Sequence, residues 1–129
     1  MIVVGYTADR FGHVALQQAI AEAKLRQTGL LVINSTKGDA LADPAFAQSG
    51  ALHDVEDQLK TSGVAYELTQ PVGVDAVEEL LDAMDRADAE LLVIGIRHRS
   101  PVGKLLLGSA SQRLLLECPK PVLAVKPPL

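Results

Sequence analysis

"AELLVIGIRHRSPVGKLLLGS", residues 89–109, contains the change of pattern that decides the fold. Its opening part, residues 89–95, is almost entirely apolar, which is typical of a short buried strand. Residues 95–109 then contain three glycines, four cationic side chains if the histidine is included, and no acid. A phosphate-binding loop has this composition, and so does a solvated basic turn that precedes a capped helix. Both interpretations remain open from the residues alone.

The rest of the chain alternates short apolar runs with longer amphipathic stretches. The apolar runs predict strands, and the stretches with apolar residues three and four positions apart predict helices. We expect strands at residues 1–6, 30–35, 64–70, 89–95 and 121–125, helices at 12–27, 52–63, 74–87 and 108–117, and a loop at 36–47.

This alternation predicts an α/β fold of three layers (α/β/α) in one domain, residues 1–129. Right-handed crossovers favour a five-stranded parallel sheet with the strand order 3-2-1-4-5. In such sheets ligands bind outside the carboxyl ends of the strands, where the direction of winding reverses. The segments that would meet there are residues 5–12, after the first strand, and residues 95–109, after the fourth.

Composition excludes several classes of protein. The net charge is −4, which disfavours a nucleic-acid binder, because binding to phosphate backbones needs a cationic surface. The single cysteine, Cys118, cannot form an internal disulfide, and we expect it to be a partly buried apolar residue. We expect no membrane span, no secretory leader and a cytoplasmic location. His13 and His53 are expected on the surface, and no residues have metal-ligand spacing.

The loop has the chemistry of an anion site. Gly95 is expected to allow a sharp turn and close approach of a ligand, and Ser109 or Ser111 can cap the helix that follows. A helix N-terminus carries roughly half a positive charge, so it attracts anions. Positive charge would be added nearby by Arg97, His98, Arg99 and Lys104.

At these residues the chain resembles the universal stress protein family. Members that bind ATP share a glycine, two residues, a second glycine, nine residues, and a third glycine followed by serine or threonine. Here Gly95 matches the first position, and Gly108 with Ser109 matches the last pair, whereas His98 replaces the middle glycine. The flanking stretches "ADAELLVIG" and "CPKPVLAVK" are similar to the family's strands. The resemblance covers nearly the whole chain and implies a fold like that of the adenine nucleotide alpha hydrolases.

The first strand departs from the pattern of nucleotide-binding members. Thr7 stands where the family usually has an aspartate, Ala8 where it has a glycine, and Asp9 where it has a serine. We expect Asp9 to cap the first helix. The resemblance implies a nucleotide site formed by Thr7, Ala8, Gly95, Arg97, His98, Gly108, Ser109, Ala110 and Ser111.

His98 is expected to narrow this site, because an imidazole replaces the hydrogen of a glycine where a backbone approaches phosphate. The sequence therefore indicates weak binding of ATP or AMP, and no carboxylate is plainly placed to hold magnesium. The main interpretation is a regulatory or protective binding module of the stress response that does not turn over substrate. Two alternatives remain: a switch that binds ATP and hydrolyses it slowly, and a scaffold that only docks onto another, unidentified protein.

The last apolar run indicates a homodimer. An apolar strand at the edge of a sheet has free N–H and C=O groups that can pair with another strand. Universal stress proteins commonly dimerise through this terminal strand, and the resemblance implies the same contact here. It would involve Pro121, Val122, Leu123, Ala124 and Val125.

Overall fold

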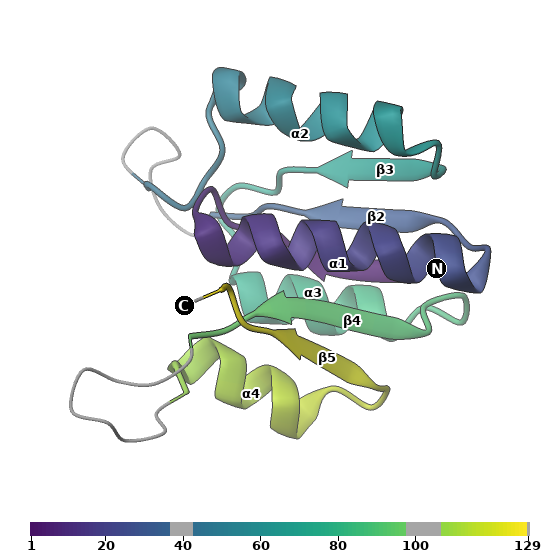
Figure 1. Ribbon diagram of the computed structural model, residues 1–129. Coiled ribbons are helices and arrows are strands. Elements are labelled where there is room, and N and C mark those ends of the chain that lie inside the picture. The colour runs from purple at the N-terminus through teal and green to yellow at the C-terminus, as the bar shows by residue number, and fades with distance from the viewer. Residues whose placement is uncertain (37–42, 98–106, 129) are drawn as a thin grey trace.

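The structure is a computed structural model that describes residues 1–36, 43–97 and 107–128. Strands and helices alternate along the chain, as the sequence predicts (Figure 1). The strands are β1 (Ile2–Gly5), β2 (Leu30–Ile33), β3 (Tyr66–Thr69), β4 (Leu91–Gly95) and β5 (Val122–Val125), and the helices are α1 (Arg10–Arg26), α2 (Ser49–Ser62), α3 (Ala76–Met84) and α4 (Ser109–Glu117).

The five strands form one parallel sheet in the order β3-β2-β1-β4-β5, which confirms the predicted topology. Successive side chains of a strand point to opposite faces of the sheet. Ile2 and Val4 therefore pack in the core under α1 and α2, whereas Val3 packs in the core under α3 and α4. The chain thus has the expected three layers, and β1 lies at the centre of the sheet with β4 beside it (Figure 1).

Helix boundaries differ from the predicted ones where a polar residue caps the helix. Asp9 caps α1, as expected, and its side chain accepts a hydrogen bond from the Gly12 amide. Asp75 caps α3 by accepting one from the Val77 amide, so this helix begins two residues later than its apolar pattern suggests. Such side-chain oxygens pair with amides that have no partner within the helix.

A buried amide, Asn34, joins the ends of three strands to the loop that follows β2. Its Nδ2 donates to the carbonyl oxygens of Tyr6 and Ala45, at 2.8 and 2.9 Å. Its Oδ1 accepts from the Ala47 amide at 2.7 Å and from Gln70 at 3.0 Å. All its hydrogen-bonding capacity is therefore used, as a polar side chain that is only 1% exposed requires.

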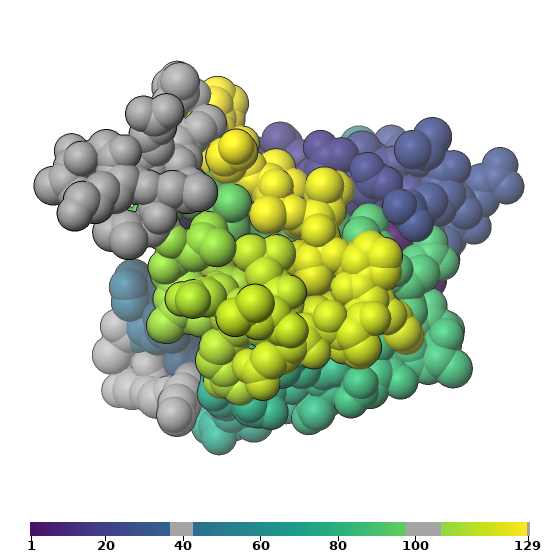
Figure 2. All heavy atoms as spheres, turned by 90° about the horizontal axis from the view of Figure 1, so that it is seen from below, coloured from purple at the N-terminus to yellow at the C-terminus, as the bar shows by residue number. Residues whose placement is uncertain are grey.

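β5 forms one edge of the sheet and β3 the other. Its Pro121 and Val125 carbonyls accept from Leu92 and Ile96 of the β4 region, at 3.0 and 2.8 Å. Because backbone groups alternate in direction along a strand, those of Val122 and Ala124 point away from β4. Figure 2 shows β5 and α4 side by side on this face of the molecule. Within the described residues, no helix is both long enough and apolar enough to cross a membrane.

Candidate nucleotide site

Two adjoining cavities lie at the carboxyl ends of β1 and β4, where the direction of winding reverses. They share three lining residues, Thr7, Gly95 and Ser111. Thr7 follows β1, Gly95 ends β4, and Ser111 lies in the first turn of α4. The segments that the sequence predicts to meet therefore do meet.

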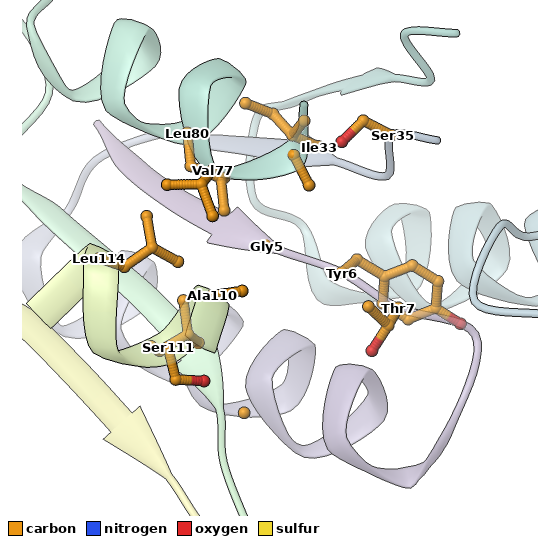
Figure 3. A pocket seen from close by; sticks show the side chains of 13 residues that line it. Gly5, Tyr6, Thr7, Ile33, Ser35, Val77, Leu80, Ala110, Ser111 and Leu114 are labelled. Carbon is orange, nitrogen blue, oxygen red and sulfur yellow. The ribbon is translucent and has the colours of Figure 1, made fainter. Parts of the chain in front are cut away.

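The first cavity is mainly apolar and has a volume of about 140 Å³. Figure 3 shows Val77, Leu80 and Leu114 on one side of it, with Tyr6 and Thr7 toward the other end. Aliphatic walls of this kind suit a flat, uncharged group. The residues that line it are Gly5, Tyr6, Thr7, Ile33, Ser35, Ala76, Val77, Leu80, Ile94, Gly95, Ala110, Ser111 and Leu114.

The second cavity is more polar and has a volume of about 200 Å³. It adds a cation, Arg97, and a carboxylate, Asp9, to the three shared residues. Its wall is completed by Phe11, Ile96, Leu107 and Gly108. A ligand with an uncharged part and an anionic part could therefore occupy both cavities at once.

The N-terminus of α4 is open toward the polar cavity. Gly108 is its N-cap residue, no side chain caps the helix, and the first helical bond runs from the Gln112 amide to the Gly108 carbonyl at 2.9 Å. The sequence-based expectation that Ser109 or Ser111 caps this helix is wrong, because both lie inside the helix. Among the described residues no side-chain oxygen caps the amides of its first turn, and such amides can donate to an anion.

The N-terminus of α1, by contrast, is neutralised by its own carboxylate. One oxygen of Asp9, Oδ1, accepts from the Gly12 amide at 2.9 Å and from the Thr7 hydroxyl at 2.7 Å. The Thr7 hydroxyl has thus used its proton, and toward the cavities it can only accept a hydrogen bond. Of the three helices that begin beside the cavities, α1 is capped by Asp9 and α3 by Asp75, whereas among the described residues no side chain caps α4.

The two glycines at the borders of the basic loop have different surroundings. A Cβ atom on Gly95 would lie 2.1 Å from the Phe11 carbonyl oxygen, so the glycine is required by the packing of α1 against β4. The first turn of α1 thus occupies the space beside the Gly95 Cα, while the residue still lines both cavities, and the approach of a ligand to it stays a prediction. A Cβ on Gly108 would meet no described atom within 4 Å.

The structure gathers six of the nine predicted site residues around the two cavities: Thr7, Gly95, Arg97, Gly108, Ala110 and Ser111. Ala8 and Ser109 line neither cavity, and the Ala8 amide donates to the Ala45 carbonyl at 2.9 Å. His98 lies outside the described residues, as do Arg99 and Lys104.

Sequence reasoning missed the wall that α3 and β2 contribute. Val77 and Leu80 belong to the apolar stripe of α3, which has the same spacing whether it covers a sheet or lines a cavity. Ser35 could have been found, because it lies two residues after β2, the neighbour of β1 in the predicted strand order.

The wall formed by α3 and α4 is held by one guanidinium group. Arg113 of α4 contacts Glu78 at 2.6 Å and Asp75 at 3.5 Å, both at the start of α3, and Glu117 of its own helix at 2.9 Å. The hydrogen bonds to Glu78 and then to Glu117 raise the pKa of Arg113 further above its ordinary value. The cation is therefore always charged and ties the two helices together.

On the other side of Asp9, burial raises the pKa of the Tyr6 phenol, and the nearby charges of Asp9 and Asp54 raise it further. Tyr6 therefore stays protonated at neutral pH.

Among the described residues, no three acidic, histidine or cysteine side chains are grouped so that they could hold a metal ion. His13 and His53 lie on the surface and Cys118 is partly buried, as expected.

Comparison with known proteins gives consistent matches. A curated universal stress protein from Mycolicibacterium smegmatis is 72% identical over 127 residues and covers 98% of each chain. A universal stress protein solved in complex with cAMP has a TM-score of 0.73 and 22% identity, over 96% of this chain and 94% of that one. One from Archaeoglobus fulgidus, solved with dAMP, has a TM-score of 0.62 and 24% identity, over 97% and 96%.

The two solved structures support the three-layer fold. The sequence profile described as "Universal stress protein family" matches residues 1–126, nearly the whole chain. Together with the 72% identical relative, this match establishes that the chain belongs to the universal stress protein family.

Proposed function

We propose that this protein binds an adenine nucleotide across the two cavities and acts as a nucleotide-responsive regulatory module of the stress response. The observation that carries the proposal is the junction of an apolar and a polar cavity at Thr7, Gly95 and Ser111. The apolar cavity suits a purine ring, and the polar one suits a phosphate beside Arg97 and the open end of α4.

The known ligands of the structural neighbours support this assignment. Both cAMP and dAMP combine an adenine base with one phosphate, and the proteins that hold them share the fold of this chain. The candidate site lacks two features of the site that the family pattern implies. Thr7 offers one accepting oxygen in place of a carboxylate, and a histidine replaces the second glycine of the loop. We therefore expect weak binding and no rapid turnover.

Isothermal titration with AMP, cAMP and ATP tests the proposal, with Ala110→Glu as the site variant. Ala110 lines the apolar cavity from the exposed first turn of α4, where a glutamate is favourable to the helix. The protein should bind AMP at one site per chain, and Ala110→Glu should abolish the signal without loss of stability. Gln112→Glu is the matched control, since this exposed residue lies two positions later and lines neither cavity.

Each result of the titration points to one function. Saturable binding without phosphate release from ATP supports the regulatory module. Binding accompanied by slow phosphate release would replace it with a hydrolysing switch. If none of the nucleotides produces heat at millimolar concentration, the proposal is contradicted, and the protein-docking scaffold remains as the alternative.

The proposal includes a homodimer formed by β5. The outward backbone groups of Val122 and Ala124 have no partner within the sheet, and a second β5 running antiparallel across a two-fold axis would pair them. Pro121, which lacks an N–H, has its carbonyl toward β4, so it removes no outward donor. We place this dimer in the cytoplasm, because a chain whose single cysteine forms no internal disulfide suits a reducing compartment.

A further inference from the structure

We infer that Asp9 determines how many phosphates the site accepts: it favours a nucleoside monophosphate and makes binding of a triphosphate depend on a divalent cation. The inference rests on the proposed nucleotide site and concerns a residue at which this chain departs from the family pattern. It follows from the balance of charge around the polar cavity, taken one group at a time.

Two described groups beside the polar cavity supply positive charge. Arg97 supplies one full charge, and the uncapped N-terminus of α4 at Gly108 supplies roughly half a charge. A phosphate group placed between Arg97 and the start of α4 would meet both of these charges. Among the described residues that line the cavity, Arg97 is the only cation.

The negative charge is Asp9, and its position is fixed. The Gly12 amide and the Thr7 hydroxyl both donate to its Oδ1, so the carboxylate cannot turn away without uncapping α1. Its Oδ2 has no hydrogen-bond partner among the described residues and remains able to accept. The Gly12 amide is taken up by this carboxylate, whose charge at the start of α1 also opposes binding of a second phosphate there.

The number of phosphate groups in the ligand therefore affects its binding. A phosphate at α4 meets Arg97 and the helix end, but each further phosphate adds charge to a cavity that also holds Asp9. At about 6 Å in water, each additional like charge weakens binding about threefold. A divalent cation removes this penalty, because Mg²⁺ is held by one or two carboxylates together with substrate phosphates. Asp9 Oδ2 is the oxygen available for that contact.

The test compares Asp9→Asn with the unchanged protein in titrations with AMP and with ATP, each with and without Mg²⁺. Asparagine keeps the side-chain oxygen that caps α1, so the fold is retained while the charge is lost. Asp54→Asn is the control: Asp54 is exposed and lines a neighbouring hollow with Tyr6 and Asp9, but lines neither cavity of the site.

Without Mg²⁺, Asp9→Asn should strengthen ATP binding about tenfold more than it strengthens AMP binding, since ATP carries about two more negative charges. Mg²⁺ should strengthen ATP binding to the unchanged protein more than to Asp9→Asn. Equal effects of the variant on AMP and ATP, or effects no larger than those of Asp54→Asn, would overturn the inference while the nucleotide site stands. If neither nucleotide binds the unchanged protein or Asp9→Asn, the proposed function fails and this inference fails with it.

Discussion

Gly95 and Gly108 border the basic loop that follows β4, and both match glycines of the family pattern. At Gly95 the missing side chain makes room for the carbonyl of Phe11, so this glycine serves the fold. At Gly108 no described atom fills the space, which lies at the open end of α4 beside the polar cavity. The two glycines match the same family pattern, but the surroundings that favour glycine differ between the two positions.

Alanine substitution should separate these two roles. Gly95→Ala should lower the free energy of unfolding by about 2 kcal/mol or more, because the methyl group would overlap the first turn of α1. Gly108→Ala should change it by less than about 1 kcal/mol, the usual scale of a change at an N-cap. Chemical denaturation measures both.

In the same proteins, Gly108→Ala should weaken AMP binding measured by titration, because the added methyl group would lie where the proposed site brings a phosphate to the amides of α4. A Gly95→Ala protein as stable as the unchanged one would refute the packing role. Unchanged AMP affinity in Gly108→Ala would show that the ligand does not approach this residue.

At the scale of elements, the strands were predictable because short apolar runs flanked by turn residues admit few other structures. The ends of the helices were less predictable, because they depend on which side-chain oxygen accepts a hydrogen bond from which backbone amide. Asp75 caps α3, whereas among the described residues no side chain caps α4. The site was predictable where it lies on strand ends, as at Thr7 and Gly95. Its α3 wall was not, because the direction in which Val77 and Leu80 face depends on packing that the pattern does not encode.

The bridge between α3 and α4 leads to a prediction about this wall. Arg113→Met keeps a long side chain but removes the ion pairs to Glu78 and Asp75, so α4 should lose its fixed position beside the site. AMP affinity should fall several-fold, while the free energy of unfolding changes little because exposed ion pairs contribute little.

Arg86→Met is the matched control for that variant, because Arg86 pairs with Asp88 at 3.2 Å and lines none of the site. Titration of both variants with AMP, at low and at high salt, decides the role of Arg113. Equal AMP affinities in the two variants would show that Arg113 does not position the site.

At the scale of the whole molecule, the observed order of the strands is one of the few that right-handed connections allow. It also places β5 at one edge of the sheet and β3 at the other. β5 lies beside β4, and the amides of Val122 and Ala124 point outward. The free edge is therefore a property of the topology and is independent of the nucleotide site.

Ala124→Pro should convert the proposed dimer to a monomer. Proline at this position removes an outward N–H and leaves the bonds of Pro121 and Val125 to the β4 region in place. Light scattering after size-exclusion chromatography measures the mass, and circular dichroism checks that the variant is folded. Slow amide hydrogen exchange at Val122 and Ala124 in the unchanged protein would give the same answer without a mutation. A monomeric unchanged protein at high concentration would contradict the prediction.

The packing of the two helices at the site is unequal. α1 is anchored by five buried residues, and at Gly12 and Gly95 its backbone lies so close to neighbouring chain that no Cβ would fit. α4 buries Leu114 alone among its nine residues. The α1 side of the site is therefore tightly packed, whereas α4 is held mainly by Leu114 and by the ion pairs of Arg113 to the start of α3. Any displacement of α4 on ligand binding should also move its C-cap residue, Cys118, so a fluorescent reporter attached to this thiol would detect it.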